Sequence, residues 1–244
     1  MSFDILQDKI KEKKNPTVAG LDARVEYIPP HILKKYTSQY GETLQAAALA
    51  VEEFDCSLID ALCDVVPAVK PQSAYFEMLG WRGMETLEEV ITHAKGKGLY
   101  VIADIKRGDI GSTAEAYADA WLGVTKVGEA FCGGFNADCV TLNGYMGADS
   151  VNPFLKVAGE RDKSVFILAK TSNPGSGELQ NVAAGEGDTV YGLMADLIEK
   201  WGAGTEGKHG YTRAGAVAGA TYPEELQKLR ARMPHTFLLV PGYG

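Results

Sequence analysis

The stretch Leu99–Ala118 reads LYVIADIKRGDIGSTAEAYA and contains the change of pattern that decides the fold. Its first five residues are apolar without alternation, which is typical of a parallel strand covered on both faces. The strand then ends in four charged residues within six positions, namely Asp104, Lys106, Arg107 and Asp109. A buried strand that ends in such a cluster indicates an α/β fold with polar chemistry at the strand ends.

Six further apolar runs are predicted to be strands of the same kind: Thr17–Asp22, Val65–Lys70, Asp138–Leu142, Ser164–Lys170, Gly215–Ala220 and Thr236–Val240. Helical patterns separate many of them. The predicted helices are Glu42–Cys63, Met84–Lys95, a helix capped by Ser112 or Thr113 and running to Val127, Thr189–Trp201 and Pro223–Arg232. This alternation, without a break in composition, predicts a (β/α)8 TIM barrel with extended loops, formed as one domain over residues 1–244. A doubly wound open sheet is the alternative, but no Gly-x-Gly-x-x-Gly follows the first strand.

The strand count is one short of a closed barrel, which needs eight strands. The sequence stops at Gly244, directly after the seventh predicted strand. Because an unclosed barrel leaves two strand edges exposed, we expect the eighth strand and its helix to lie beyond residue 244. Two connections are long: 23–64, with an added helical region, and the glycine-rich 171–212. Within the second, 171–188 is either a substrate loop or a flexible surface excursion.

The composition excludes several classes of protein. Apolar residues make up 45% of the 244 residues, the net charge is −8, and no basic stripe is present, which argues against nucleic-acid binding. No run approaches the roughly 20 apolar residues of a membrane span, and Ser2–Asn15 is too charged for a signal peptide. The cysteine pairs Cys56/Cys63 and Cys132/Cys139 are spaced by seven, unlike a metal knuckle, so we expect free buried thiols and a cytoplasmic setting.

Polar residues recur where the predicted strands end: Asp22, Lys70, Asp104, Lys106, Asn143, Lys170 and Ser172. In a barrel these ends meet at one mouth. Asp104 and Lys106 are two apart, so an extended strand would point both to one side. Lys70 is positioned to pair with Asp104, and Asp109 would complete a Lys–Asp–Lys–Asp array. Such an array suits decarboxylation or proton transfer at carbon without a cofactor, whereas a structural ion-pair network at the barrel mouth is the alternative.

Six motifs in order carry a family resemblance: GLD at Gly20–Asp22, VKPQ at Val69–Gln72, DIKRGDIGST at Asp104–Thr113, TSNPG at Thr171–Gly175, GAT at Gly219–Thr221 and VPGYG at Val240–Gly244. Over nearly its whole length the chain resembles the orotidine 5′-phosphate decarboxylases, in their longer bacterial form. The Asp-x-Lys-x-x-Asp core is shared with a related barrel family, so the added TSNPG makes the match specific.

The resemblance implies a role for each matched residue. Asp22 would bind the ribose, Lys70 a ribose hydroxyl and Asp104, and Ser172 the pyrimidine edge. Asp104 would lie near the substrate carboxylate, and Lys106 would donate a proton to C6. Asp109 and Thr113 would act across the interface of a homodimer. Ile110 would also bind substrate, and Pro241 and Gly242 would begin the phosphate site, whose Gln and Arg are expected beyond residue 244.

Three other functions remain as alternatives. A magnesium-dependent sugar-phosphate lyase or decarboxylase of the same superfamily, of the hexulose-phosphate synthase type, shares the core motif but has no use for TSNPG. A Schiff-base aldolase would use Lys70, Lys106 or Lys170. A nucleotide-binding protein without catalysis would not require the charged array. The resemblance implies neither a metal nor a cofactor, and Lys170 has no role in it beyond an ion pair at the barrel mouth.

Overall fold

The computed structural model describes residues 2–185, 187–221 and 223–242 of the chain, which form two compact units. The first unit, called here the N-unit, consists of Ile5–Ile105 and Val124–Asp138. The second, the C-unit, consists of Met1–Asp4, Lys106–Gly123 and Cys139–Gly244. Helix α1 (Ser2–Lys13) and strand β3 (Tyr100–Arg107) contribute residues to both units.

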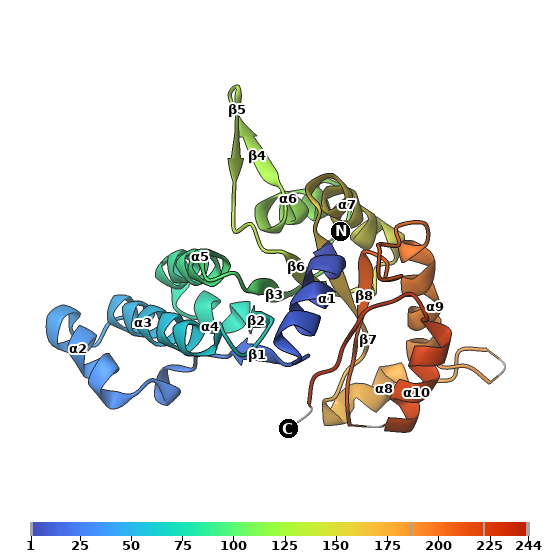
Figure 1. Ribbon diagram of the computed structural model, residues 1–244, viewed down its shortest axis with the longest axis horizontal. Helices are drawn as coiled ribbons and strands as arrows, with labels where there is room; N and C mark the ends of the chain where they lie inside the picture. The colour runs from blue at the N-terminus through green and yellow to red at the C-terminus, as the bar shows by residue number, and fades with distance from the viewer. Residues whose placement is uncertain (1, 186, 222, 243–244) are drawn as a thin grey trace. The chain divides into compact units, whose positions relative to one another are not determined.

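The N-unit combines parallel strands with a layer of helices (Figure 1). Its elements are most of α1, β1 (Val18–Leu21), a 3-10 turn (Val25–Tyr27), α2 (Pro30–Tyr40), α3 (Leu44–Leu62), β2 (Ala68–Pro71), α4 (Ser73–Glu77), α5 (Gly80–Gly96), most of β3, β4 (Val124–Val127) and β5 (Ala130–Gly133). The register pairs Gly20 with Lys70 and Ala68 with Tyr100. Parallel pairing therefore brings the carboxyl ends of these three strands to one edge, as the strand pattern predicted.

The C-unit repeats this strand–helix order (Figure 1). Its elements are α6 (Gly111–Trp121), β6 (Cys139–Leu142), α7 (Ala148–Arg161), β7 (Ser164–Lys170), a 3-10 turn (Pro174–Ser176), α8 (Gly177–Gln180), α9 (Val190–Gly202), β8 (Ala214–Ala218), α10 (Pro223–Arg232) and β9 (Leu238–Leu239). Strands β6 to β9 pair in parallel in chain order. An aromatic cluster packs within this unit, with ring centres 4.8 Å apart for Phe3–Phe166 and 5.1 Å apart for Phe3–Phe237.

The main sheet has the strand order β1-β2-β3-β6-β7-β8-β9, so all seven predicted strands are present. Their ends differ from the prediction by one to three residues for most strands. Helix α10 has the predicted bounds, and α9 begins after Thr189, whose side chain accepts a hydrogen bond from the Gly192 N–H at 3.2 Å. The strand pattern thus predicted the sheet correctly, because fully apolar runs distinguish covered parallel strands from amphipathic helices.

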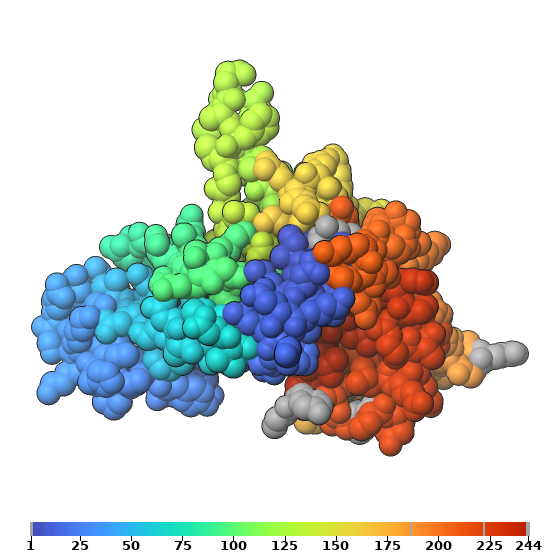
Figure 2. Space-filling model, viewed as in Figure 1, coloured from blue at the N-terminus to red at the C-terminus, as the bar shows by residue number. Residues whose placement is uncertain are grey.

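The segment after α6 was predicted wrongly. The helix ends at Trp121 rather than Val127, because the Gly123 N–H bonds back to the carbonyl of Ala118 and closes the last turn. An antiparallel hairpin follows, formed by β4 (Val124–Val127) and β5 (Ala130–Gly133). Its side chains are largely exposed, and the hairpin forms a slender finger in Figure 2.

Other local predictions also fail. The cap is Ile110, which has no side-chain oxygen, rather than Ser112 or Thr113. Helix α7 was missed because Pro153 lies inside it, and short turns of helix lie within the glycine-rich 171–188. The described cysteines are free as expected, but only Cys139 is buried.

No helix among the described residues has the length and apolar character needed to cross a membrane.

A close approach within the N-unit makes Gly83 of α5 indispensable. A Cβ added there would lie 1.9 Å from the carbonyl oxygen of Phe76 in α4, whereas one added at Gly96 of the same helix meets nothing within 4 Å. Gly83→Ala is therefore expected to lower the free energy of unfolding by about 2 kcal/mol or more, as overpacking does. Gly96→Ala is the matched control and is expected to be neutral or to stabilise by about 0.5–1 kcal/mol. Urea unfolding of both variants measures the difference, and equal stabilities would contradict the packing argument.

Candidate active site

The predicted ion pair between Lys70 and Asp104 is present in the N-unit. Lys70 Nζ lies 3.0 Å from Asp104 Oδ2, and both side chains are largely shielded from solvent. Gln72 Nε2 donates to the same oxygen at 3.0 Å, from the position that pairs with Asp104 across the two strands. Donors to a carboxylate favour its ionised form. The carboxylate of Asp104 is therefore held in place with a cation beside it. Gln72 is a second partner of Asp104, which the sequence did not predict.

The backbone at Lys106 departs from the extended strand that the prediction assumed. Its φ is +46°, a left-handed conformation that costs a residue with a side chain about 1–2 kcal/mol. Within the C-unit, the Lys106 N–H donates to Thr141 Oγ1 at 3.0 Å and the Asn143 N–H donates to the Arg107 carbonyl at 2.8 Å. These bonds to the end of β6 hold the strained residue. The expectation that Asp104 and Lys106 point to the same side assumed an extended strand, and the backbone is not extended at Lys106.

The segment after Lys106 turns sharply into α6. A side chain at Gly108 would be crowded, because a Cβ there would lie 3.0 Å from the Asn143 carbonyl oxygen. The Ile110 N–H donates to Asp109 Oδ1 at 2.8 Å, which fixes the carboxylate at the start of the helix. Ile110 and Thr113 are exposed. The turn therefore presents these predicted substrate-binding residues on a surface of the C-unit.

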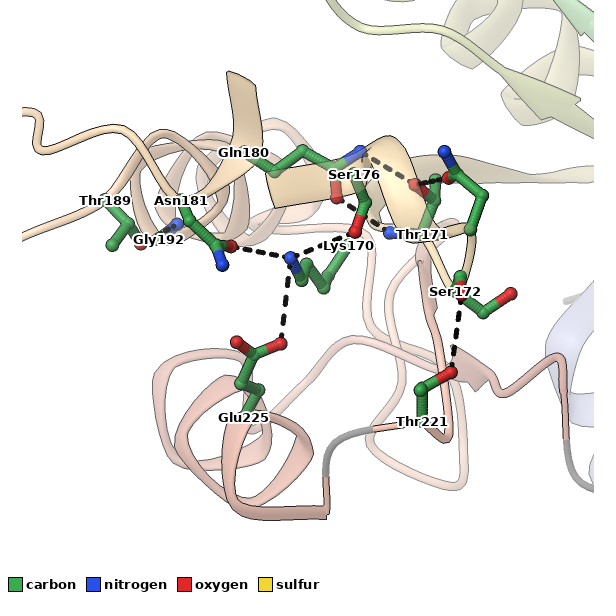
Figure 3. Close-up of polar contacts among 11 residues, drawn as sticks. Lys170, Thr171, Ser172, Ser176, Gln180, Asn181, Thr189, Gly192, Thr221 and Glu225 are labelled. Atoms are coloured by element: carbon green, nitrogen blue, oxygen red, sulfur yellow. Dashed lines mark hydrogen bonds and ion pairs between the residues drawn. The ribbon is translucent and has the colours of Figure 1, made fainter. Parts of the chain in front are cut away.

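Three of the sequence motifs converge around Ser172 in the C-unit, and Figure 3 shows the contact of Ser172 with Thr221. Thr221 Oγ1 donates to the Ser172 carbonyl at 3.5 Å, and a Cβ on Gly219 would meet the Ser172 backbone at 3.0 Å. A Cβ on Gly242 would lie 3.6 Å from Ser172 Oγ. The Ala220 N–H donates to the Pro241 carbonyl at 2.9 Å. The TSNPG, GAT and VPG segments thus form one cluster, whereas Tyr243 and Gly244 lie outside the described residues.

A buried carboxylate that sequence reasoning missed lies in the N-unit. Asp55 in α3 is fully buried, and neither of its carboxylate oxygens has a hydrogen-bond partner. Burial, with a smaller contribution from the negative charge of Asp22, raises the pKa of Asp55 to about 7. The apolar periodicity of the helix concealed it, because one aspartate within an apolar stripe has no distinctive sequence signal.

The ionised form of Asp55 opposes folding. Its folded pKa of about 7 exceeds the unfolded value of about 3.9, so the folded protein binds more protons between these two pH values. The free energy of unfolding is therefore expected to fall by up to about 4 kcal/mol as pH rises from 4 to 7, and then to level off. Asp55→Asn should remove this dependence and raise stability at pH 8. Urea unfolding from pH 4 to 8 measures it, with the exposed-site variant Asp64→Asn as control, and an unchanged profile in Asp55→Asn would contradict the argument.

Taken together, the alternating strands and helices and the lysine–aspartate pair at the strand ends define an α/β-barrel protein with a charged site. Among the described residues, no cluster of three or more His, Cys, Asp or Glu side chains is suited to hold a metal ion. Each unit contributes one group of site residues: the N-unit holds Lys70 with Asp104, and the C-unit holds Ser172 with the glycine motifs.

Comparison with known proteins then gives the family. A model of the orotidine 5′-phosphate decarboxylase / HUMPS family matches residues 44–244. Orotidine 5′-phosphate decarboxylase of Rhodopirellula baltica is 45% identical over 228 residues, which cover 93% of this chain and 73% of that protein. The enzyme of Clostridium perfringens is 37% identical over 244 residues, covering 100% of this chain and 79% of its own. The chain therefore belongs to the orotidine 5′-phosphate decarboxylase / HUMPS family.

A solved structure supports the same assignment. The OMP decarboxylase of Leishmania donovani superimposes with a TM-score of 0.76 and is 33% identical, covering 99% of this chain and 79% of that one. The predicted TIM-barrel class is thus confirmed. The eighth strand, expected beyond residue 244, is not among the described residues.

Proposed function

We propose that the chain decarboxylates orotidine 5′-phosphate to uridine 5′-phosphate and carbon dioxide, as a carbon–carbon lyase in the last step of UMP biosynthesis. The observation that carries this proposal is the ion pair of Lys70 with Asp104, in a chain of this family that also contains TSNPG. The name of the family includes other reactions, but the relatives at 36–45% identity are named orotidine 5′-phosphate decarboxylases. The magnesium-dependent sugar-phosphate reaction is therefore not favoured.

In the proposed mechanism, Asp104 and Lys106 act on opposite ends of one bond. The C6–carboxylate bond breaks, its electron pair stays on C6, and carbon dioxide leaves. Asp104 lies beside the substrate carboxylate, so their repulsion ends when the neutral product departs. Lys106 stabilises the developing carbanion by its charge and then transfers an ammonium proton to C6. Lys70 keeps Asp104 ionised, and Asp22 binds the ribose.

Loss of orotate absorbance in the presence of a chelator tests the reaction and its independence of metal. Wild-type protein is expected to turn over orotidine 5′-phosphate, whereas Lys106→Ala should lose about 10⁴-fold or more of kcat, the combined effect of an acid catalyst and a charge at the carbanion. Because Lys106 acts in the transition state, this variant should bind uridine 5′-phosphate within about tenfold of wild type. Lys126→Ala, on the exposed strand β4, is the control. Near-normal turnover in Lys106→Ala, or abolition of wild-type turnover by the chelator, would refute the mechanism.

We further propose a homodimer in which Asp109 and Thr113 complete the active site of the partner subunit. Support comes from their position at an exposed helix start, directly after Lys106 along the chain. Four free cysteines and the nucleotide substrate support a cytoplasmic location, with no part for membranes or nucleic acid. The substrate-binding group also includes Ile110, Pro241 and Gly242.

Mixing two inactive variants tests the shared site. Lys106→Ala and Asp109→Ala, refolded together in equal amounts, should form hybrid dimers in half of all cases, each with one intact site if Asp109 acts across the interface. About a quarter of wild-type activity is then expected to return, measured by the same absorbance assay. Each variant refolded alone is the control. If Asp109 acts within its own subunit, no hybrid contains an intact site and no activity returns.

A further inference from the structure

Lys170, at the end of β7, is a buried ammonium without a role in the proposed reaction. Its residue is 2% exposed. Its Nζ donates to Asn181 Oδ1 at 2.6 Å and to Ser176 Oγ at 3.4 Å, and lies 3.8 Å from Glu225 Oε2 (Figure 3). It also lies 5.3 Å from the ring centre of Tyr191. These partners come from four segments that follow β7 in the chain, so one charge connects all four.

The main chain fixes the position of this ammonium. The register of β7 against β8 shifts between Leu168 and Lys170. Such an irregularity re-aims the side chains beside it. The Gly219 N–H donates to the Lys170 carbonyl at 2.9 Å, which ties this residue to the end of β8. Lys170 is therefore a fixed point for the loop that follows.

Ser172 lies two residues after Lys170, in a loop that is hydrogen-bonded back to itself. The Thr171 N–H donates to Gln180 Oε1 at 2.9 Å, and Gln180 Nε2 donates to Thr171 Oγ1 at 2.7 Å. The contact of Lys170 with Asn181, the next residue, closes the same loop from the strand side. Two adjacent contacts thus close the loop: Thr171 with Gln180, and Lys170 with Asn181. The second one anchors the loop to the sheet, because Lys170 is the last residue of β7.

Glu225 extends the network to α10. Its Oε2 is buried and has no hydrogen bond, and it faces Lys170 across 3.8 Å. The side chain of Glu225 is partly exposed, but a carboxylate oxygen buried without a hydrogen bond is stabilised by a nearby positive charge, and the ammonium of Lys170 supplies one. Helix α10 follows the GAT segment, whose Thr221 donates to the Ser172 carbonyl. The two segments that contact Ser172 are thus both connected to Lys170.

Stability alone does not explain an ammonium at this position. Well-packed apolar side chains often replace a buried ion pair with no loss of stability, because desolvating two charges offsets their attraction. What an apolar side chain lacks is directional hydrogen bonding to Asn181 and Ser176. We propose that Lys170 is a positioning residue, which holds the Ser172 loop in the conformation that recognises the pyrimidine edge. This inference rests on the role proposed for Ser172 in binding the base.

Discrimination between two nucleotides tests the proposal. Uridine and cytidine 5′-phosphates differ only at the pyrimidine edge, so the ratio of their dissociation constants reports recognition there. Calorimetry is used on wild type, Lys170→Met, Ser172→Ala and the double variant. Lys170→Met is expected to lower the cytidine-to-uridine ratio about tenfold, the effect of one hydrogen bond to the base. The double variant should lose no more than the larger single effect, because both changes remove the same recognition.

Two further variants complete the test. Asn181→Ala removes only the shortest hydrogen bond of the ammonium and should lower the ratio by about threefold. It replaces Lys170→Met in the test if that variant fails to fold. Lys228→Met, on the exposed face of α10, should leave the ratio unchanged. A lower thermal midpoint with an unchanged ratio in Lys170→Met and Asn181→Ala would overturn the proposal, as would losses that multiply in the double variant. Direct binding separates this proposal from the proposed reaction. If wild type discriminates between the nucleotides but does not turn over substrate, only the proposed reaction is contradicted. If wild type does not bind uridine 5′-phosphate, both the proposed reaction and the role of Lys170 are overturned.

Discussion

Parallel pairing of the strands is the constraint on which the functional residues depend. In the N-unit, Gly20 pairs with Lys70 and Gln72 with Asp104, so the residues that end β1, β2 and β3 meet at one edge. In the C-unit, the pairing of β7 with β8 brings the TSNPG and GAT segments together in the same way. Backbone pairing therefore selects which side chains meet, and the side chains need only provide charges and hydrogen bonds of the right kind.

Burial of charge distinguishes the roles of the ionic groups. Asp104 accepts hydrogen bonds from Lys70 and Gln72, whereas the ammonium of Lys170 donates to the oxygens of Ser176 and Asn181 and lies 3.8 Å from Glu225 Oε2. Asp55 has neither kind of partner, and its pKa rises accordingly. Two carboxylates about 4 Å apart repel by about 4 kcal/mol at an effective dielectric constant near 20. In the proposed reaction, a substrate carboxylate beside Asp104 would meet such repulsion.

The sequence predicted what depends on local pattern and composition. Covered strands and α10 were found from apolar runs and a proline at the helix start, and the pairing of Lys70 with Asp104 followed from their places at neighbouring strand ends. The left-handed backbone of Lys106, the bulge at Lys170 and the burial of Asp55 were not predictable, since each depends on tertiary packing. The hairpin after α6 was missed because its residues are exposed and have no buried face to set a period.

The strain at Lys106 and the network at Lys170 solve the same physical problem differently. Each lysine lies at the carboxyl end of a strand, Lys106 in β3 and Lys170 in β7, where the chain leaves the sheet. At Lys106 the backbone takes an unfavourable conformation. The hydrogen bond from the Lys106 N–H to Thr141 Oγ1 and the one from the Asn143 N–H to the Arg107 carbonyl compensate for it. At Lys170 the strand register shifts, and the side chain donates hydrogen bonds to Ser176 and Asn181. The bonds that hold Lys106 thus include those of its backbone, whereas the bonds that hold Lys170 include those of its buried ammonium.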